Sequence, residues 1–416
     1  MNSSAPVIIV GAGHAGGRAA LALRELGYRG AILLIGEETQ LPYERPPLSK
    51  QILLGSQTPV HCALGSAERY QSDGIQLRTG ARVERIDRAS RSVMLSNGEV
   101  LPYSQLLLAT GGRVRALALP GAMLDGVHYL RTLDDALALK ARLRPGTRMV
   151  VIGGGFIGLE VAASARQLGA HVTMLEAGDR LAARALPPQL AERVRQLHCS
   201  RGVDVRLQCR IRAFSGTSSV TAVELEGGDS LSCDLIAIGV GIVPNVELAA
   251  AAGMEVGNGI RVDSRLRTSD PNIYAIGDVC EFPNPFTGQP VRMETWRNAE
   301  EQAHHVARIL NGEDVPFTAL PWFWSDQFDY SLQLAGEPQV ASRMVERKAT
   351  DDSLLLFYLN EHRQLVGVCG WGAGNSIAKD IKLAERLIAS GNPLIPEVLA
   401  TPSVSLKSLI QDASYA

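Results

Sequence analysis

The chain has 416 residues with a hydrophobic share of 46% and a charged share of 20%, a composition typical of globular proteins and not of disordered ones. This length is too great for one compact core and indicates two or three domains. The formal net charge of −2 argues against a general polyanion-binding role, so we expect no nucleic-acid partner.

The N-terminus and the cysteines bear on location. Residues 1–6 carry no basic segment, and no apolar stretch reaches the about 18 residues of a membrane span, so we expect neither a secretory signal nor a membrane anchor. The six cysteines are scattered, and no two of them have the spacing of a zinc ribbon or of a local redox disulfide. We therefore expect a cytoplasmic protein without a metal site.

The first predicted elements form a strand–loop–helix–strand unit. A buried strand at residues 7–10 leads into the loop GAGHAG at 11–16 and a helix at 18–26. A second strand at 31–35 follows, and Glu37 stands just beyond its end. A G-x-G-x-x-G loop in this context, with an acid about twenty residues later, is typical of a dinucleotide site.

Each part of this loop has a physical task. Gly11 permits the tight turn, Gly13 lets a pyrophosphate approach the backbone, and Gly16 lets the helix pack on the strand. The helix N-terminus supplies N–H groups and partial positive charge, while Glu37 can accept hydrogen bonds from a ribose diol.

The same unit recurs later in the chain. A strand at 149–152 leads into the loop GGGFIG at 153–158 and a helix at 159–168, and the next strand, at 172–175, ends at Glu176. A single loop of this kind is also found as an ordinary glycine-rich turn. Two copies in the same context favour two dinucleotide sites.

Glu176 bears on which nicotinamide nucleotide binds at the second site. A carboxylate there accepts hydrogen bonds from a free 2′-hydroxyl but repels a 2′-phosphate, which predicts NADH over NADPH. Arg180 and Arg184 lie nearby in the sequence and are candidates for phosphate contacts. The alternative is that Glu176 is an exposed strand-end carboxylate without a ligand.

Three further apolar strands end in glycine turns, at residues 106–112, 235–241 and 272–278, the last in Gly277-Asp278. Such strand ends lie at the ligand crevice of open α/β sheets. Two dinucleotide sites on one chain favour a relay in which a nicotinamide nucleotide gives a hydride to a resident flavin, because flavin takes a hydride and releases electrons singly.

Together these features resemble the FAD-dependent, NADH-dependent ferredoxin reductases of bacterial oxygenase systems. The resemblance covers essentially the whole chain, and its most specific signs are PPLSK at 46–50, residues 153–160 and 268–278, and LPWFWSDQ at 320–327. It implies a glutathione-reductase-like α/β fold, with two Rossmann-like dinucleotide-binding domains and a smaller C-terminal α/β domain.

The resemblance also implies domain boundaries. The FAD-binding domain would be discontinuous, at residues 1–113 and 247–325, with the NAD-binding domain inserted at 114–246. A C-terminal domain at 326–416 would close over the flavin.

Site residues follow from the same resemblance. The FAD-binding positions would be Gly11, Gly13, Ala15, Gly16, Glu37, Arg45, Lys50, Val83, Arg131, Asp278 and Trp296. The NAD-binding positions would be Gly153, Gly155, Gly158, Glu160, Glu176, Arg184 and Gly241. Asp278 would contact the ribityl chain, and Trp296 would cover the pyrimidine edge of the flavin, although it is equally well explained as a core aromatic residue.

Lys50 and Glu160 are the two predicted catalytic positions. Pro46 and Pro47 stiffen the chain before Lys50, and Glu160 follows the second glycine loop by two residues. The resemblance puts them together near flavin N5 as an ion pair beside the incoming nicotinamide. Because hydride transfer needs no general base, both are expected to position other groups. The alternative is a surface lysine and an unpaired helix-end acid.

Thiol chemistry is disfavoured, because residues 48–54 contain no cysteine and Cys62 and Cys280 each stand alone. Electrons would therefore pass to an external acceptor, and the resemblance implies that this acceptor is a small iron–sulfur ferredoxin that feeds a cytochrome P450 or Rieske dioxygenase. Such ferredoxins are acidic, and Lys379, Lys382 and Arg386 share a helical face, although acids outnumber bases in residues 326–416.

Three alternatives to this activity stay open. The chain could be an NADH oxidase, a rubredoxin reductase or a non-catalytic NADH-sensing flavoprotein.

Overall fold

The computed structural model describes residues 5–348 and 352–411. The chain divides into two compact units. Unit 1 combines Met1–Glu44, Cys62–Arg113 and Val243–Phe323. Unit 2 combines Arg45–His61, Val114–Ile242 and Trp324–Ala416. The three-domain division expected from the sequence differs from these units, because it puts residues 45–61 in the FAD-binding domain, and it stays a prediction.

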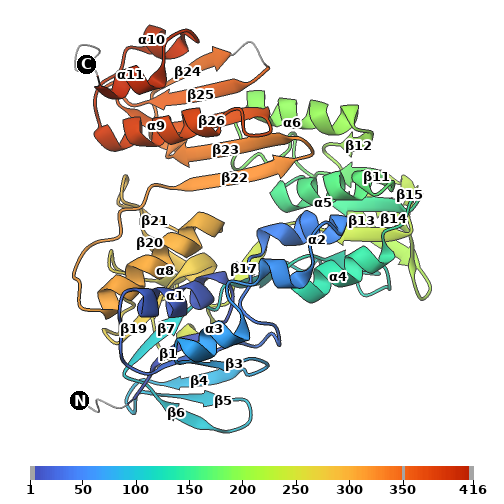
Figure 1. Ribbon diagram of the computed structural model, residues 1–416. Helices are drawn as coiled ribbons and strands as arrows, with labels where there is room; N and C mark the ends of the chain where they lie inside the picture. Colours follow the sequence, from blue (N-terminus) through green and yellow to red (C-terminus); the bar gives the residue numbers. More distant parts are fainter. Residues whose placement is uncertain (1–4, 349–351, 412–416) are drawn as a thin grey trace. The chain divides into compact units, whose positions relative to one another are not determined.

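Unit 1 is built on a five-stranded sheet of order β19-β7-β1-β2-β3, whose strands are all parallel (Figure 1). Its strands are β1 (Val7–Val10), β2 (Ile32–Ile35), β3 (Ile75–Arg78), β7 (Gln105–Leu108) and β19 (Ile273–Ala275). Strands β1, β2 and β19 are buried along their whole length. Their continuous apolar runs are explained by burial of both faces of a parallel sheet.

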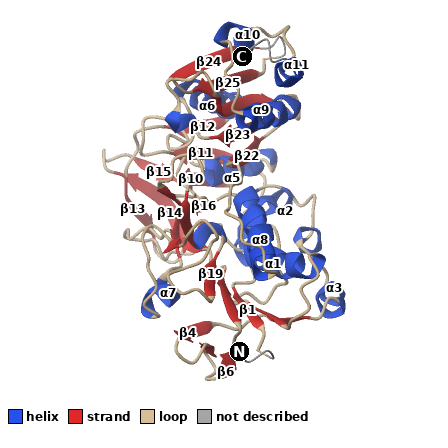
Figure 2. Ribbon diagram, turned by 90° about the vertical axis from the view of Figure 1, so that its left-hand side faces the viewer, coloured by secondary structure: helices blue, strands red, loops and turns tan. Residues whose placement is uncertain are grey.

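Different elements cover the two faces of this sheet. Helices α1 (His14–Glu25) and α8 (Trp296–Leu310) pack side by side on one face (Figure 2). The other face packs against a three-stranded antiparallel sheet and helix α7 (Glu247–Ala251). That sheet comprises β4 (Val83–Asp87), β5 (Ser92–Leu95) and β6 (Val100–Pro102). Unit 1 also contains α3 (Ala67–Ser72), β18 (Ile260–Arg261), the 3-10 turn η3 (Gly277–Val279), β20 (Cys280–Pro283) and β21 (Pro290–Val291).

Unit 2 repeats this architecture with a parallel sheet of order β12-β11-β10-β16-β9. Its strands are β9 (Val127–Tyr129), β10 (Arg148–Ile152), β11 (His171–Leu175), β12 (Val203–Arg206) and β16 (Leu235–Ile238). One face carries α4 (Leu133–Arg142), α5 (Phe156–Gln167) and α6 (Pro188–Ser200). The other carries the antiparallel strands β13 (Ile211–Gly216), β14 (Val220–Leu225) and β15 (Ser230–Ser232). This repetition confirms the two predicted Rossmann-like folds.

The C-terminal part of unit 2 is an antiparallel sheet of order β22-β23-β26-β25-β24 (Figure 1). Its strands are β22 (Trp322–Gln327), β23 (Tyr330–Gly336), β24 (Arg343–Lys348), β25 (Leu354–Leu359) and β26 (Leu365–Ala373). Helices α9 (Ala378–Ser390), α10 (Pro396–Ala400) and α11 (Leu406–Gln411) follow. Leu332, Leu354 and Trp371 of this sheet share one apolar cluster with helices α5 and α6, so the sheet is anchored on the second nucleotide fold.

Short elements complete the chain. The turn η1 (Pro46–Ser49) and helix α2 (Gln51–Leu54) belong to unit 2, while η2 (Pro59–Cys62), η4 (Pro338–Val340) and the paired strands β8 (Gly112–Val114) and β17 (Ile242–Pro244) lie in connections. Within the described ranges, every helix is too short or too polar to cross a bilayer.

Candidate active site

The first glycine loop leaves no room for side chains. Gly11 has φ +108°, and a Cβ there would stand 2.2 Å from the Ala109 carbonyl oxygen. A Cβ at Gly16 would stand 1.9 Å from the Gly11 carbonyl oxygen. Gly13 caps helix α1 without a side-chain hydrogen bond, so the N–H groups of the first turn, which includes the buried Ala15, are left for a ligand. The loop therefore fits a nucleotide pyrophosphate.

The second loop has the same geometry. Gly153 has φ +99°, and a Cβ there would stand 2.5 Å from the Gly239 carbonyl oxygen. A Cβ at Gly158 would stand 2.1 Å from the Gly153 carbonyl oxygen, and Gly155 caps helix α5 without a side-chain hydrogen bond. Both predicted dinucleotide loops are thus formed, each in its own unit.

The two acids that follow the loops differ in how they are held. The Glu37 side chain is largely exposed, and its Oε1 lies 3.2 Å from Arg82 Nη1. The Glu176 carboxylate accepts hydrogen bonds from the backbone N–H groups of Gly154, at 2.7 Å, and Gly178, at 2.6 Å. Glu176 is therefore fixed against the nucleotide loop itself, which argues against the alternative of a free strand-end carboxylate.

The other NAD-binding positions lie in the same unit. Gly241 has φ +98°, and Nη2 of the exposed Arg184 lies 3.6 Å from where a Cβ would stand at Gly241. The structure therefore brings together the predicted phosphate-binding arginine and the glycine turn after strand β16.

Lys50 and Glu160 meet in unit 2. Lys50 Nζ lies 3.5 Å from Glu160 Oε1 and 3.2 Å from Asp326 Oδ2. The Glu160 side chain is buried, whereas the Asp326 side chain is 43% exposed. The ammonium group thus lies between an inner and an outer carboxylate. The predicted pair is formed, which argues against an isolated surface lysine.

Two buried hydroxyl groups also donate to Glu160. Ser49 Oγ lies 2.5 Å from Glu160 Oε2, and Ser325 Oγ lies 2.6 Å from Glu160 Oε1. Burial raises the pKa of Glu160, while the charge of Lys50 and the hydrogen bonds from Ser325 and Ser49 oppose that rise. Both oxygens of this buried acid are satisfied by donors.

The tryptophans of β22 contact different cations. Lys50 Nζ lies 5.5 Å from the ring centroid of Trp324, and the Arg297 guanidinium lies 5.3 Å from that of Trp322. Side chains two residues apart in a strand lie on the same face, so the two rings meet these cations at different points along β22.

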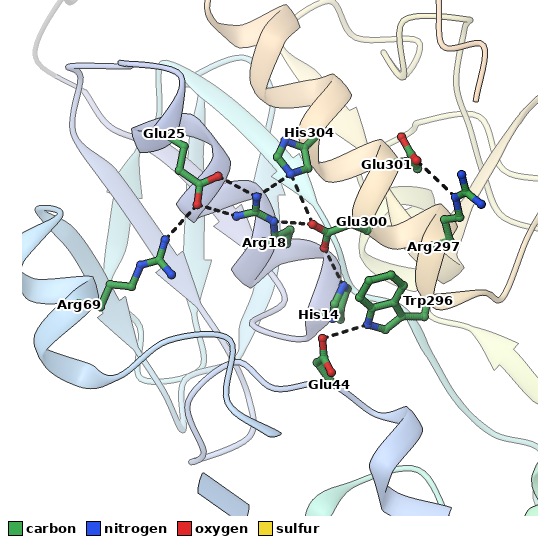
Figure 3. Close-up of polar contacts among 10 residues, drawn as sticks. All are labelled: His14, Arg18, Glu25, Glu44, Arg69, Trp296, Arg297, Glu300, Glu301 and His304. Atoms are coloured by element: carbon green, nitrogen blue, oxygen red, sulfur yellow. Dashed lines mark hydrogen bonds and ion pairs between the residues drawn. The ribbon is translucent and has the colours of Figure 1, made fainter. Parts of the chain in front are cut away.

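The remaining FAD positions of unit 1 lie around helices α1 and α8. Trp296 begins α8; its Nε1 donates to Glu44 Oε1 at 3.3 Å, and its ring centroid lies 5.2 Å from that of His14 (Figure 3). Because Trp296 is half-buried and hydrogen-bonded, it is not a plain core aromatic residue. Val83 is buried in β4, and the Asp278 backbone oxygen accepts a hydrogen bond from Arg292.

Three predicted FAD positions belong instead to unit 2. Arg45 Nη1 donates to the Arg131 backbone oxygen at 2.5 Å, and Lys50 follows Arg45 after one turn of η1. The FAD positions Gly11, Gly13, Ala15, Gly16, Glu37, Val83, Asp278 and Trp296 belong to unit 1.

The cysteines do not form a redox centre. All six lie in the described part of the chain and all are free thiols. Cys62 and Cys280 are buried, and burial raises the pKa of both thiols, which disfavours the reactive thiolate. Across the described ranges, no group of three or more His, Cys, Asp or Glu side chains is arranged to hold a metal ion.

Comparison with known proteins places the chain. A model of the pyridine nucleotide-disulphide oxidoreductase family matches residues 5–303, and one of the reductase C-terminal domain matches 322–410. The ferredoxin–NAD(+) reductase component of the anthranilate 1,2-dioxygenase system of Burkholderia cepacia is 42% identical over 98% of this chain and 100% of its own. The chain belongs to the pyridine nucleotide-disulphide oxidoreductase family, among its ferredoxin reductases. The family expected from the resemblance is confirmed.

Two further relatives support the same placement of this ferredoxin reductase. Putidaredoxin reductase from Pseudomonas putida is 38% identical over 99% of this chain and 98% of its own. The crystal structure of a covalent putidaredoxin reductase–putidaredoxin complex matches with a TM-score of 0.94 at 38% identity. The match covers 100% of the present chain and 100% of the matched chain.

Several polar residues of this ferredoxin reductase were missed by sequence reasoning. Ser49, Ser325 and Asp326 contact the Lys50–Glu160 pair, although their motifs, PPLSK and LPWFWSDQ, were recognised as family signs. His14 and Glu300 form part of a network between α1 and α8 that no local pattern indicates, because its members lie 286 residues apart.

Proposed function

We propose that this ferredoxin reductase binds FAD and NADH, takes a hydride from NADH and passes single electrons to a small iron–sulfur ferredoxin. That ferredoxin would feed a cytochrome P450 or a Rieske-type dioxygenase. One combination of features carries the proposal. Two glycine loops lead into helices whose N-termini have no side-chain cap, and they occur together with the Lys50–Glu160 pair and with six cysteines that are all free thiols.

The chain's own residues have separable tasks. The N–H groups at the start of α1 bind the FAD pyrophosphate, and those at the start of α5 bind the NADH pyrophosphate. Glu176 accepts hydrogen bonds from the ribose hydroxyls of NADH, and Arg184 beside Gly241 contacts its phosphates. Bound FAD supplies the ability to accept a hydride and to release its electrons one at a time.

Lys50 and Glu160 act as positioning residues. The ammonium group of Lys50 supplies positive charge that favours reduced, anionic flavin, and Glu160 holds that group in place or orients the nicotinamide carboxamide. The proline pair before Lys50 and the two serine donors to Glu160 restrict the positions of both side chains.

The electron acceptor follows from the relatives and from the thiols. One relative is named as the ferredoxin–NAD(+) reductase component of a dioxygenase system, another is named putidaredoxin reductase, and a putidaredoxin reductase was crystallised in a covalent complex with putidaredoxin. A chain whose described cysteines are all free, with the residues around Lys50 lacking cysteine, has no thiol pair to receive electrons from the flavin. We place the protein in the cytoplasm, where a soluble ferredoxin and NADH meet.

The proposal is tested by reduction of cytochrome c with NADH, with small iron–sulfur ferredoxins added one at a time to the FAD-bound enzyme. We expect reduction that depends on one ferredoxin and slow oxygen consumption with NADH alone. Fast oxygen consumption without a ferredoxin would identify an NADH oxidase instead. Turnover with rubredoxin but with no ferredoxin would identify a rubredoxin reductase.

A further inference from the structure

A chain of hydrogen bonds leads from helix α6 to Glu160 through the interior of unit 2. His198 Nε2 lies 3.0 Å from Gln327 Oε1, and Gln327 Nε2 lies 2.9 Å from Ser325 Oγ. Ser325 Oγ lies 2.6 Å from Glu160 Oε1. His198, Gln327 and Ser325 are each 0% exposed, so these groups must satisfy one another.

The direction of each bond follows from chemistry. A carboxylate only accepts, so the Ser325 hydroxyl donates to Glu160, and the Ser325 oxygen then accepts from the Gln327 amide. This orientation turns the Gln327 oxygen toward His198, which must carry its hydrogen on Nε2. Three donors therefore point one way, toward the carboxyl group of Glu160.

The protonation state of His198 agrees with this direction of the hydrogen bonds. Burial lowers the pKa of His198 to about 4, although its hydrogen bond with Gln327 opposes the shift, so the ring is neutral near pH 7. With its hydrogen on Nε2, the neutral ring has none on Nδ1, and Nδ1 is a buried atom without a partner among the described residues. A bare nitrogen in such a place is less costly than an unpaired N–H group.

We propose that Ser325, Gln327 and His198 are positioning residues that set the proton content of Glu160, and thereby decide whether Lys50 pairs with the inner or the outer carboxylate. This inference rests on the proposed function, since it concerns the pair assigned to the nicotinamide side of the site.

The charges around Glu160 explain why its protonation affects the pairing of Lys50. It faces Lys50 and Ser49 from the segment before α2, and Ser325 and Asp326 from β22. Lys50 Nζ is 3.5 Å from Glu160 and 3.2 Å from Asp326. Once Glu160 is protonated, Asp326 is the remaining carboxylate that attracts the ammonium group. Protonation of Glu160 therefore favours pairing of Lys50 with Asp326, the more exposed of the two carboxylates.

A matched pair on the neighbouring strand provides the control. Ser331 and Gln333 of β23 are also buried, have the same spacing of two residues, and share a hydrogen bond of 3.4 Å from Gln333 Nε2 to Ser331 Oγ. Among the described residues, no hydrogen bond joins Ser331 or Gln333 to Glu160. Replacing Ser331 thus imposes the same loss of a buried hydroxyl without touching the chain that ends on Glu160.

The experiment is a titration of the Glu160 carboxyl group by infrared spectroscopy in the oxidised, FAD-bound enzyme without NADH. The band is assigned by its absence in Glu160→Gln. Ser325→Ala removes a donor to the charged form, so we expect the pKa of Glu160 to rise by about one unit or more. Gln327→Leu should give a smaller rise, Ser325→Thr should restore the original titration, and Ser331→Ala should leave it unchanged.

The same variants separate this inference from the proposed function. If Ser325→Ala leaves the Glu160 titration where the parent protein has it, the inference is wrong and the proposed function is untouched. Stopped-flow reduction of the flavin by NADH across pH is the second measurement, and its pH dependence should move with the carboxyl titration. A shifted titration of Glu160 with an unchanged pH dependence of the flavin reduction rate would support the chain of hydrogen bonds. It would contradict the role proposed for the Lys50–Glu160 pair.

Discussion

At Glu176, two backbone N–H groups hold the carboxylate beside the second glycine loop, where the proposed function puts the ribose of NADH. Removing that charge should relieve repulsion of a 2′-phosphate and remove acceptors for a free 2′-hydroxyl. We expect Glu176→Ala to lower the ratio of kcat/KM for NADH to that for NADPH by at least about tenfold, about 1.4 kcal/mol. Steady-state kinetics with both nucleotides measures the ratio.

The control for this change is Asp204→Asn on the adjacent strand β12, which removes an exposed charge that pairs with Arg206. It should leave the ratio unchanged. Comparable kcat/KM values for NADH and NADPH in the unmodified enzyme would contradict the role of Glu176 in selecting NADH.

Lys50 is held between two carboxylates and over the ring of Trp324, so its charge has a fixed place. Lys50→Met retains most of the side-chain length and removes the charge. We expect flavin reduction by NADH to slow at least about tenfold in stopped-flow traces, because charge stabilisation at the reacting ring is lost. Lys348→Met, at a 70% exposed lysine side chain, is the matched change and should have no effect. An unchanged rate in Lys50→Met would contradict the proposed role.

At the scale of elements, the contact between α1 and α8 carries a polar network (Figure 3). Glu300 of α8 accepts from His14 at 3.1 Å and from Arg18 Nε at 2.6 Å, both of them in α1. Burial by itself would raise the pKa of Glu300, but the hydrogen bonds from His14 and Arg18 and the charge of Arg18 lower it to about 2. The network ties the helix that follows the first glycine loop to the helix that begins at Trp296.

This depressed pKa predicts the pH dependence of stability. Because Glu300 is a stronger acid in the folded state, its contribution is fully present above about pH 5 and is lost as the pH falls from 4.5 toward about 2. After a discount for solvent screening, we expect Glu300→Gln to lower the free energy of unfolding by about 1–2 kcal/mol at pH 7. Urea denaturation at several pH values should show this difference shrinking below about pH 4.5.

The neighbouring Glu301 provides a matched control for that prediction. Its side chain is 44% exposed and pairs with Arg297 of the same helix at 3.5 Å. Exposed pairs one helical turn apart contribute about 0.3–0.5 kcal/mol, so Glu301→Gln should cost little at any pH. Equal losses in the two variants would show that the charge of α8, and not its contact with α1, is responsible.

At the scale of the whole molecule, the proposed function requires a surface for an acidic ferredoxin. Helix α9 buries Ile381, Ala384 and Leu387 on one side, while Lys379, Lys382 and Arg386 are exposed. We expect reversal of these three charges to glutamate to raise KM for the ferredoxin at least about fivefold at low salt, because attraction between the partners is lost. NADH–ferricyanide activity should stay intact, and an equal loss of both activities would indicate misfolding.

The glycine loops are the part of the site that sequence alone determined. Gly11, Gly16, Gly153 and Gly158 could be assigned because each Cβ would collide with a backbone carbonyl within the same strand–loop–helix unit or its neighbouring strand. That constraint is steric and mostly local, so it leaves a fixed spacing in the chain. The apolar strands around the loops are equally readable, since burial of both sheet faces demands continuous apolar runs.

Only the tertiary structure decided how Glu160 is satisfied. Its donors Ser49 and Ser325 are 111 and 165 residues away, and Asp326 shares Lys50 with it from the exposed side. Such contacts depend on how β22 and η1 pack against α5, and that packing is set by the shapes of many apolar side chains at once. No spacing in the sequence records it, because a hydroxyl reaches a carboxylate only after the chain has folded around both.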